Sequence, residues 1–117
     1  MSTKQPNLKL QALSALLRNP DRWPASFGPW NYANWSTCAC GLAVESGIAT
    51  DLGEQFGMAP RDFDHVFAVV APGLSTADTT PEIVANRIDN YLAAQRAERR
   101  EMAQRENRWR MMFAVAS

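Results

Sequence analysis

Cysteine and histidine are scarce in this 117-residue chain, which has two cysteines and one histidine. Cys38 and Cys40 are separated by one residue, a spacing that disfavours an unstrained disulfide and differs from the cysteine frameworks of small secreted domains. We therefore expect two reduced thiols. A structural zinc site needs four ligands, and these cysteines with His65 supply only three. The sequence predicts no bound metal and no cofactor.

Long apolar runs are also absent. No stretch approaches the roughly 20 consecutive apolar residues that span a bilayer, and residues 1–9 are polar, with no apolar signal-peptide segment behind them. We expect a cytoplasmic protein that does not enter membranes. With 46% hydrophobic residues, the chain has material for one modest core.

The net charge is zero, but the charges are unevenly distributed. Residues 1–44 have a balance of +3, residues 45–89 of −6 and residues 90–117 of +3. An acidic middle thus lies between two basic ends, which could pair with it or leave it for a basic partner.

Helical periodicity and capping residues predict an all-α protein, a small orthogonal bundle of about five helices ending in a long one. Leu10, Leu13 and Leu17 share one face of a first helix, capped by Asn7 and stopped at Asn19-Pro20. Further helices are expected over residues 37–46, which are small and suited to close packing around Gly41, over 50–56, and from Pro60 to about Val70.

Residues 21–35 form an aromatic loop, in which Pro24, Gly28 and Pro29 prevent regular structure. Each buried ring contributes about 2 kcal/mol or more of transfer free energy, so five exposed rings would be costly. We expect the loop to pack on the helices. Its five rings are Trp23, Phe27, Trp30, Tyr32 and Trp35.

The clearest local signal is Thr80-Pro81-Glu82, a helix cap followed by a proline and an acidic residue in the first turn. The long helix that starts here has an apolar face as far as Leu92. Beyond Ala94 charged residues dominate, with neither glycine nor proline. We therefore divide the chain into a helical core, residues 1–94, and a helical C-terminal arm, residues 95–117.

The arm carries the candidate binding residues, because tryptophan, methionine and arginine are enriched at protein contacts. They are Met102, Arg105, Arg108, Trp109, Met112 and Phe113. The leading hypothesis is a non-enzymatic interaction protein that binds a protein partner, or a second copy of itself as a dimer, through this helix.

Two alternatives belong to other classes. A thiol-dependent hydrolase would use Cys38 or Cys40 with His65 as base, although we expect His65 to be partly buried and bonded to a backbone group, Asp62 or Asp64. Nucleic-acid binding would use the six arginines of the arm, which glutamates interrupt. No sequence motif assigns a catalytic residue.

The order of features resembles that of small uncharacterised helical proteins of actinobacteria and their phages. It rests on the Leu10–Leu17 helix, the tryptophans between Trp23 and Trp35, Cys38-Ala39-Cys40-Gly41 and Thr80-Pro81-Glu82. The resemblance covers about residues 8–92. It implies an α-helical fold and an origin in a phage or mobile element, where an inhibitor of a host protein would fit, and it carries over no catalytic residue.

Overall fold

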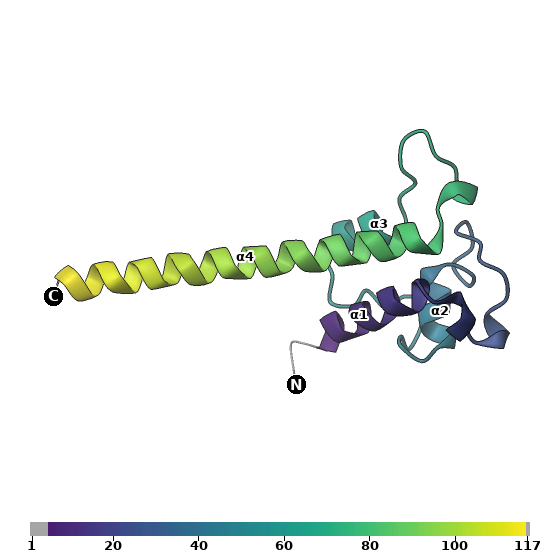
Figure 1. Cartoon of the computed structure of the whole chain (residues 1–117), viewed down its shortest axis with the longest axis horizontal. Helices are drawn as coiled ribbons and strands as arrows, with labels where there is room; N and C mark the ends of the chain where they lie inside the picture. The colour runs from purple at the N-terminus through teal and green to yellow at the C-terminus, as the bar shows by residue number, and fades with distance from the viewer. Residues whose placement is uncertain (1–4, 117) are drawn as a thin grey trace.

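The computed structural model describes residues 5–116, and within that range the regular structure is helical, without a β-strand. There are four α-helices: α1 (Gln5–Leu17), α2 (Ala39–Glu45), α3 (Pro60–Phe67) and α4 (Pro81–Ala116) (Figure 1). Three short 3₁₀ turns join them: η1 (Pro20–Arg22), η2 (Ala25–Phe27) and η3 (Thr76–Asp78). The all-α prediction is confirmed. The expected number of about five α-helices is wrong by one.

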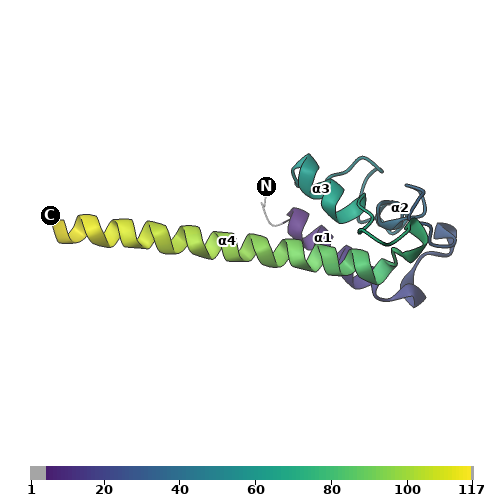
Figure 2. The same ribbon diagram turned by 90° about the horizontal axis from the view of Figure 1, so that it is seen from above.

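Helix α1 packs on the first half of α4, crossing it obliquely and running in roughly the opposite direction (Figure 2). Its predicted apolar face is confirmed, since Leu10, Leu13 and Leu17 are all fully buried. Polar contacts flank this face: the Ser14 hydroxyl donates to Asp89 Oδ1 at 2.7 Å, and Arg18 Nη2 donates to Asp89 Oδ2 at 2.6 Å. These bonds fix the position of α1 along α4.

Helix α2 is the small, buried helix that the sequence predicts, but it is shorter than residues 37–46. Cys38 is its N-cap residue, because Thr37 is held in the preceding turn. The backbone N–H of Thr37 donates to Asn34 O, and its carbonyl oxygen accepts from Asn31 N. The expected close contact at Gly41 is confirmed: a Cβ atom there would lie 2.1 Å from the carbonyl oxygen of Ser36. Only glycine allows this approach of the two backbone segments.

The helix predicted over residues 50–56 does not form. Asp51 accepts a hydrogen bond from Gly53 N at 2.8 Å, and Glu54 accepts one from Thr50 N at 3.3 Å, so side chains satisfy the backbone locally. Phe56 has a positive φ of 53° and is buried against Phe67, with ring centroids 5.8 Å apart. Burial of this ring overrides the helical propensity of the segment.

Helix α3 begins at Pro60 as predicted but ends at Phe67, short of Val70. The reason is the carbonyl oxygen of Val69, which accepts hydrogen bonds from the Tyr32 hydroxyl at 2.9 Å and from Arg87 Nη1 at 2.7 Å. The chain therefore leaves the helix to meet the aromatic loop and α4.

The aromatic loop packs on the helices as predicted, with one exception. Phe27 and Tyr32 are buried, and the indole nitrogens of Trp23 and Trp30 donate to Leu16 O at 2.7 Å and Thr79 O at 3.0 Å. Trp35 is the exception, since it is half-exposed.

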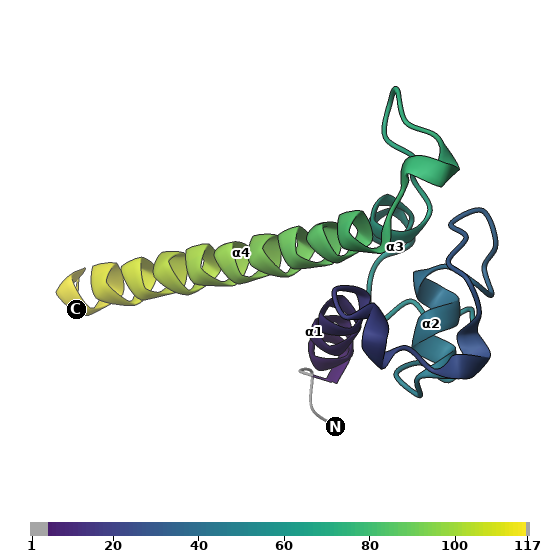
Figure 3. The same cartoon turned by 45° about the vertical axis from the view of Figure 1, so that its right-hand side comes forward.

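Helix α4 extends far beyond the other helices as a straight rod (Figures 1 and 3). The molecule measures 64 × 36 × 23 Å, and its radius of gyration is 17.9 Å, against about 13 Å for a compact domain of about 100 residues. No helix in the described range is long and apolar enough to cross a membrane. The protruding part of α4 is what makes the molecule elongated.

Candidate functional site

The arm is the continuation of a helix whose first half is built into the core. The predicted start of this helix is confirmed: Thr80 Oγ1 accepts from Ile83 N at 3.3 Å, and Pro81 is the first helical residue. Val84, Ile88 and Leu92 are buried against the other helices. Val84 and Met102 are eighteen residues apart, which is five turns of 3.6 residues, so they lie on the same side of α4. The core-facing side of the helix therefore continues into the arm.

The side chains on this continued side are exposed. All side chains described from Arg96 to Met112 are exposed, including Met102, Trp109 and Met112, whose exposed fractions are 63%, 60% and 67%. Their spacing of seven and three residues aligns them along one side of the helix, whereas Met111 lies opposite. We call Met102, Trp109 and Met112 the arm seam. Arg105 and Arg108 are exposed beside it, and the side chain of Phe113 lies outside those described.

Gln95 marks the change from covered to uncovered helix. Its Nε2 donates to the Tyr91 hydroxyl at 2.7 Å, while its Oε1 is buried without a hydrogen-bond partner in the described structure. Such an atom costs about 1–3 kcal/mol of desolvation.

The two basic ends of the chain differ in the ion pairs that they form. The N-terminal end pairs with the acidic middle, through Lys9 Nζ and Glu54 Oε2 at 3.0 Å and through Arg18 and Asp89. Burial disfavours ionisation of Asp89, but hydrogen bonds from Ser14 and Arg18 outweigh it, and the pKa of this carboxyl lies below its usual value. Among the described side chains, the arm's one ion pair joins Arg110 to Glu106, one turn apart and well exposed. The arm thus leaves its positive charge unpaired with the acidic middle.

The two thiols form a buried pair at the start of α2. Both cysteines are free. A hydrogen bond from the Cys40 thiol lowers the pKa of Cys38 to about 6. Burial opposes this shift, and hydrogen bonds from backbone N–H groups add to it. The same bond, together with burial, raises the pKa of Cys40. Cys38 also lines a pocket of about 300 Å³ with Tyr32, Trp35 and Phe67.

His65 is not brought into this pair. The prediction that it is partly buried is wrong: it lies on the exposed side of α3, whereas Phe63, Val66 and Phe67 fill the buried side. The described side chains also contain no group of three or more histidine, cysteine, aspartate or glutamate residues placed to hold a metal ion. His65 is thus exposed to solvent, whereas both thiols are buried.

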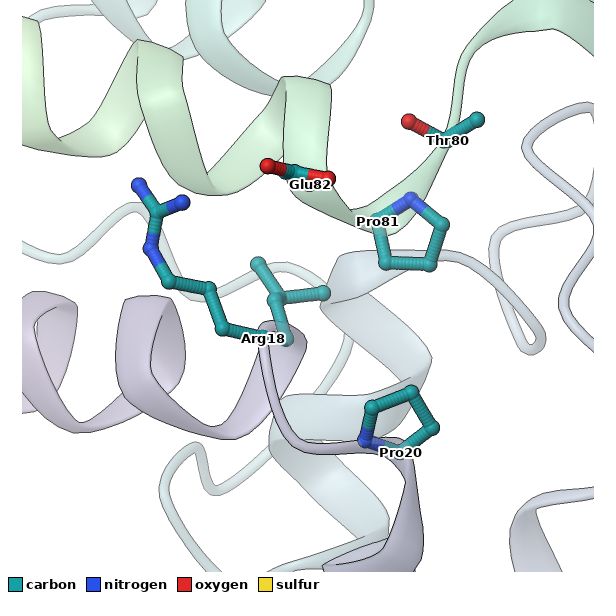
Figure 4. Close-up of a pocket in the computed structure, with 6 residues that line it drawn as sticks. Arg18, Pro20, Thr80, Pro81 and Glu82 are labelled. Carbon is teal, nitrogen blue, oxygen red and sulfur yellow. The ribbon is translucent and has the colours of Figure 1, made fainter.

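A second pocket, of about 410 Å³, separates the end of α1 from the start of α4 (Figure 4). Arg18, Thr80 and Glu82 line it. Arg18 is already bonded to Asp89, and the Glu82 carboxylate would repel an anion. This pocket offers no matched set of groups for a charged ligand.

The third hollow was not predicted from the sequence. Trp35, Leu52, Gly53, Gln55, Phe63 and Asp64 line a groove of about 470 Å³, which we call the Trp35 groove. Trp35 stacks on Phe63 with ring centroids 6.4 Å apart. The half-exposed ring in an otherwise buried aromatic loop is the feature that reveals it.

Comparison with known proteins adds no relative: no protein-family model and no curated protein matches the chain, and no solved structure matches its fold. Interpretation of the site therefore rests on its own residues.

Proposed function

We propose that this chain is a non-enzymatic protein-interaction module that binds its partner through the arm. The observation that supports the proposal is the arm seam, which presents three large apolar side chains to solvent on one side of the protruding half of α4. Exposed methionine and tryptophan side chains on a preformed helix match the helix-in-groove mode of recognition, in which anchors recur at helical spacing.

The energetic reason is the cost of exposed apolar area. Covering a large apolar side chain contributes roughly 1.5–3 kcal/mol, and the arm seam holds three such side chains. Because the helix is held at its base by the core, a partner that binds it meets a partly ordered surface and loses less conformational entropy. In a phage or mobile element, such a module would suit an inhibitor of a host protein.

The test compares the full chain with a triple variant, Met102→Gln, Trp109→Gln and Met112→Gln. Met111→Gln is the matched control, since Met111 is 69% exposed on the opposite side of the helix. Sedimentation of the purified proteins and co-purification from the native host are the measurements. We expect the triple variant to lose association, while its unfolding midpoint is unchanged when both proteins are compared at concentrations low enough to keep them monomeric. If both proteins are monomers and recover the same partners, the proposal is wrong.

Nucleic-acid binding remains the second candidate, because the arm exposes six arginines. Four of them, Arg96, Arg99, Arg100 and Arg110, fall on one side of the helix, whereas Arg105 and Arg108 fall on the other. Phosphate binding that uses several arginines weakens steeply as salt rises. Binding to a mixed-sequence duplex without such weakening would exclude this candidate.

A further inference from the structure

The Trp35 groove and the arm are complementary in side-chain type and in charge. The groove exposes an indole and Leu52, with exposed fractions of 49% and 42%, beside the Asp64 carboxylate. None of its six lining residues is basic. The arm exposes apolar side chains beside Arg105 and Arg108. An apolar groove with an acidic rim fits an apolar helix face with basic neighbours.

The arm cannot reach the groove of its own chain. Helix α4 is a single 36-residue helix without an internal glycine or proline, and the figures show it straight from three directions (Figures 1–3). Sharp bends in helices need proline, glycine or a bulge. From Arg96 to Ala116 the arm extends about 30 Å away from the body. Any contact between arm and groove is therefore made between two molecules.

We propose that the arm of one copy docks in the Trp35 groove of a second copy, with Trp109 and Met112 against Trp35 and Leu52 and with Arg105 or Arg108 facing Asp64. This inference rests on the proposed function, and it names the partner as a second copy of this chain. Reciprocal docking about a twofold axis would fill both grooves and close the dimer.

The free acidic charge on the body supports this occupant. Glu54 and Asp89 are neutralised by Lys9 and Arg18, whereas Asp64 is exposed on α3 and pairs with no basic side chain in the described part of the chain. The arm's arginines are the complementary charges left over. Each end of the chain would then neutralise part of the acidic middle, one within the molecule and one between molecules.

The experiment uses full chains carrying one change each, in the groove or in the arm. Leu52→Lys changes the groove, and Leu74→Lys is its matched control, since Leu74 is 44% exposed outside the groove. Trp109→Gln changes the arm. Sedimentation velocity over a range of concentrations gives the dissociation constant of each protein. We expect Leu52→Lys and Trp109→Gln each to raise it by about 30-fold or more, the effect of losing an interface hot spot, and Leu74→Lys to leave it unchanged.

Mixing the two defective proteins identifies the contact. A Leu52→Lys chain keeps a working arm and a Trp109→Gln chain keeps a working groove, so their mixture restores one of the two contacts. We expect association in the mixture at concentrations where each protein alone is monomeric. A mixture that stays monomeric overturns the docking model.

Two other results also overturn it, and they bear differently on the proposed function. If Trp109→Gln abolishes association but Leu52→Lys does not, the arm binds elsewhere, and the function of the arm stands. If the unmodified chain is monomeric at every concentration, self-docking is wrong, and the arm's function then depends on whether the triple variant loses a foreign partner.

Discussion

Two truncations ten residues apart on α4 separate its core half from its arm. Leu92 is 5% exposed and Met102 is 63% exposed. Removing the Leu92 side chain leaves a cavity, and buried leucine-to-alanine changes cost about 2–5 kcal/mol. We expect Leu92→Ala to lower the free energy of unfolding by about 3 kcal/mol. For Met102→Ala we expect a change within about 0.5 kcal/mol, because exposed substitutions have small effects and alanine favours helix.

Urea unfolding followed by circular dichroism, at protein concentrations low enough to keep the chain monomeric, measures both values. At about 4 °C for each kcal/mol, Leu92→Ala should also lower the unfolding midpoint by roughly 12 °C. Low concentration is needed because association would add stability to the native state. Equal losses for the two variants in the monomer would refute the division of α4 near Gln95, since they would mean that Met102 packs on its own body.

Three further predictions concern the core, the thiols and the arm's base. Gly41→Ala should destabilise the fold by about 3 kcal/mol or more in urea unfolding, because its Cβ would meet the Ser36 carbonyl oxygen at 2.1 Å; a cost below about 0.5 kcal/mol would contradict the contact. The thiolate absorbance of Cys38 should appear with a midpoint near the pKa of about 6, and Cys40→Ala should move that midpoint upward. The free energy of unfolding should rise with pH from about 6 towards the usual thiol pKa of about 8.5, because the unfolded chain binds more protons than the folded chain in this range. A flat stability profile would count against the hydrogen-bonded pair of thiols. In a Tyr91→Phe background, where the bond from Gln95 Nε2 is already lost, Gln95→Leu should stabilise the chain by about 1 kcal/mol, since it removes a buried acceptor without a partner. Destabilisation in that background would contradict the unpartnered acceptor.

Local signals predicted those parts of the fold that local chemistry decides. The cap at Thr80 and Pro81 needs only neighbouring residues, and the three leucines of α1 share a face in any helix of that register. The same holds for Gly41, whose lack of a side chain indicates close packing wherever it lies.

Tertiary contacts decided the rest. Residues 50–56 have helical propensity, yet Phe56 is buried in a left-handed conformation that a helix excludes. The Trp35 groove combines side chains from three separate stretches of the chain, so no single stretch could reveal it. Sequence patterns also place Cys38, Cys40 and His65 in one hypothesis, whereas only the fold shows that His65 is exposed while both thiols are buried.

Hydrogen–deuterium exchange of the full chain at low and high concentration tests the central claim most directly. At low concentration, the amides of residues 96–112 should exchange much faster than those of residues 84–92, because an undocked helix opens readily. At high concentration, the arm and residues 52–64 should become protected together. An arm as protected as residues 84–92 at the lowest concentration, or one that no concentration or partner protects, would contradict the account.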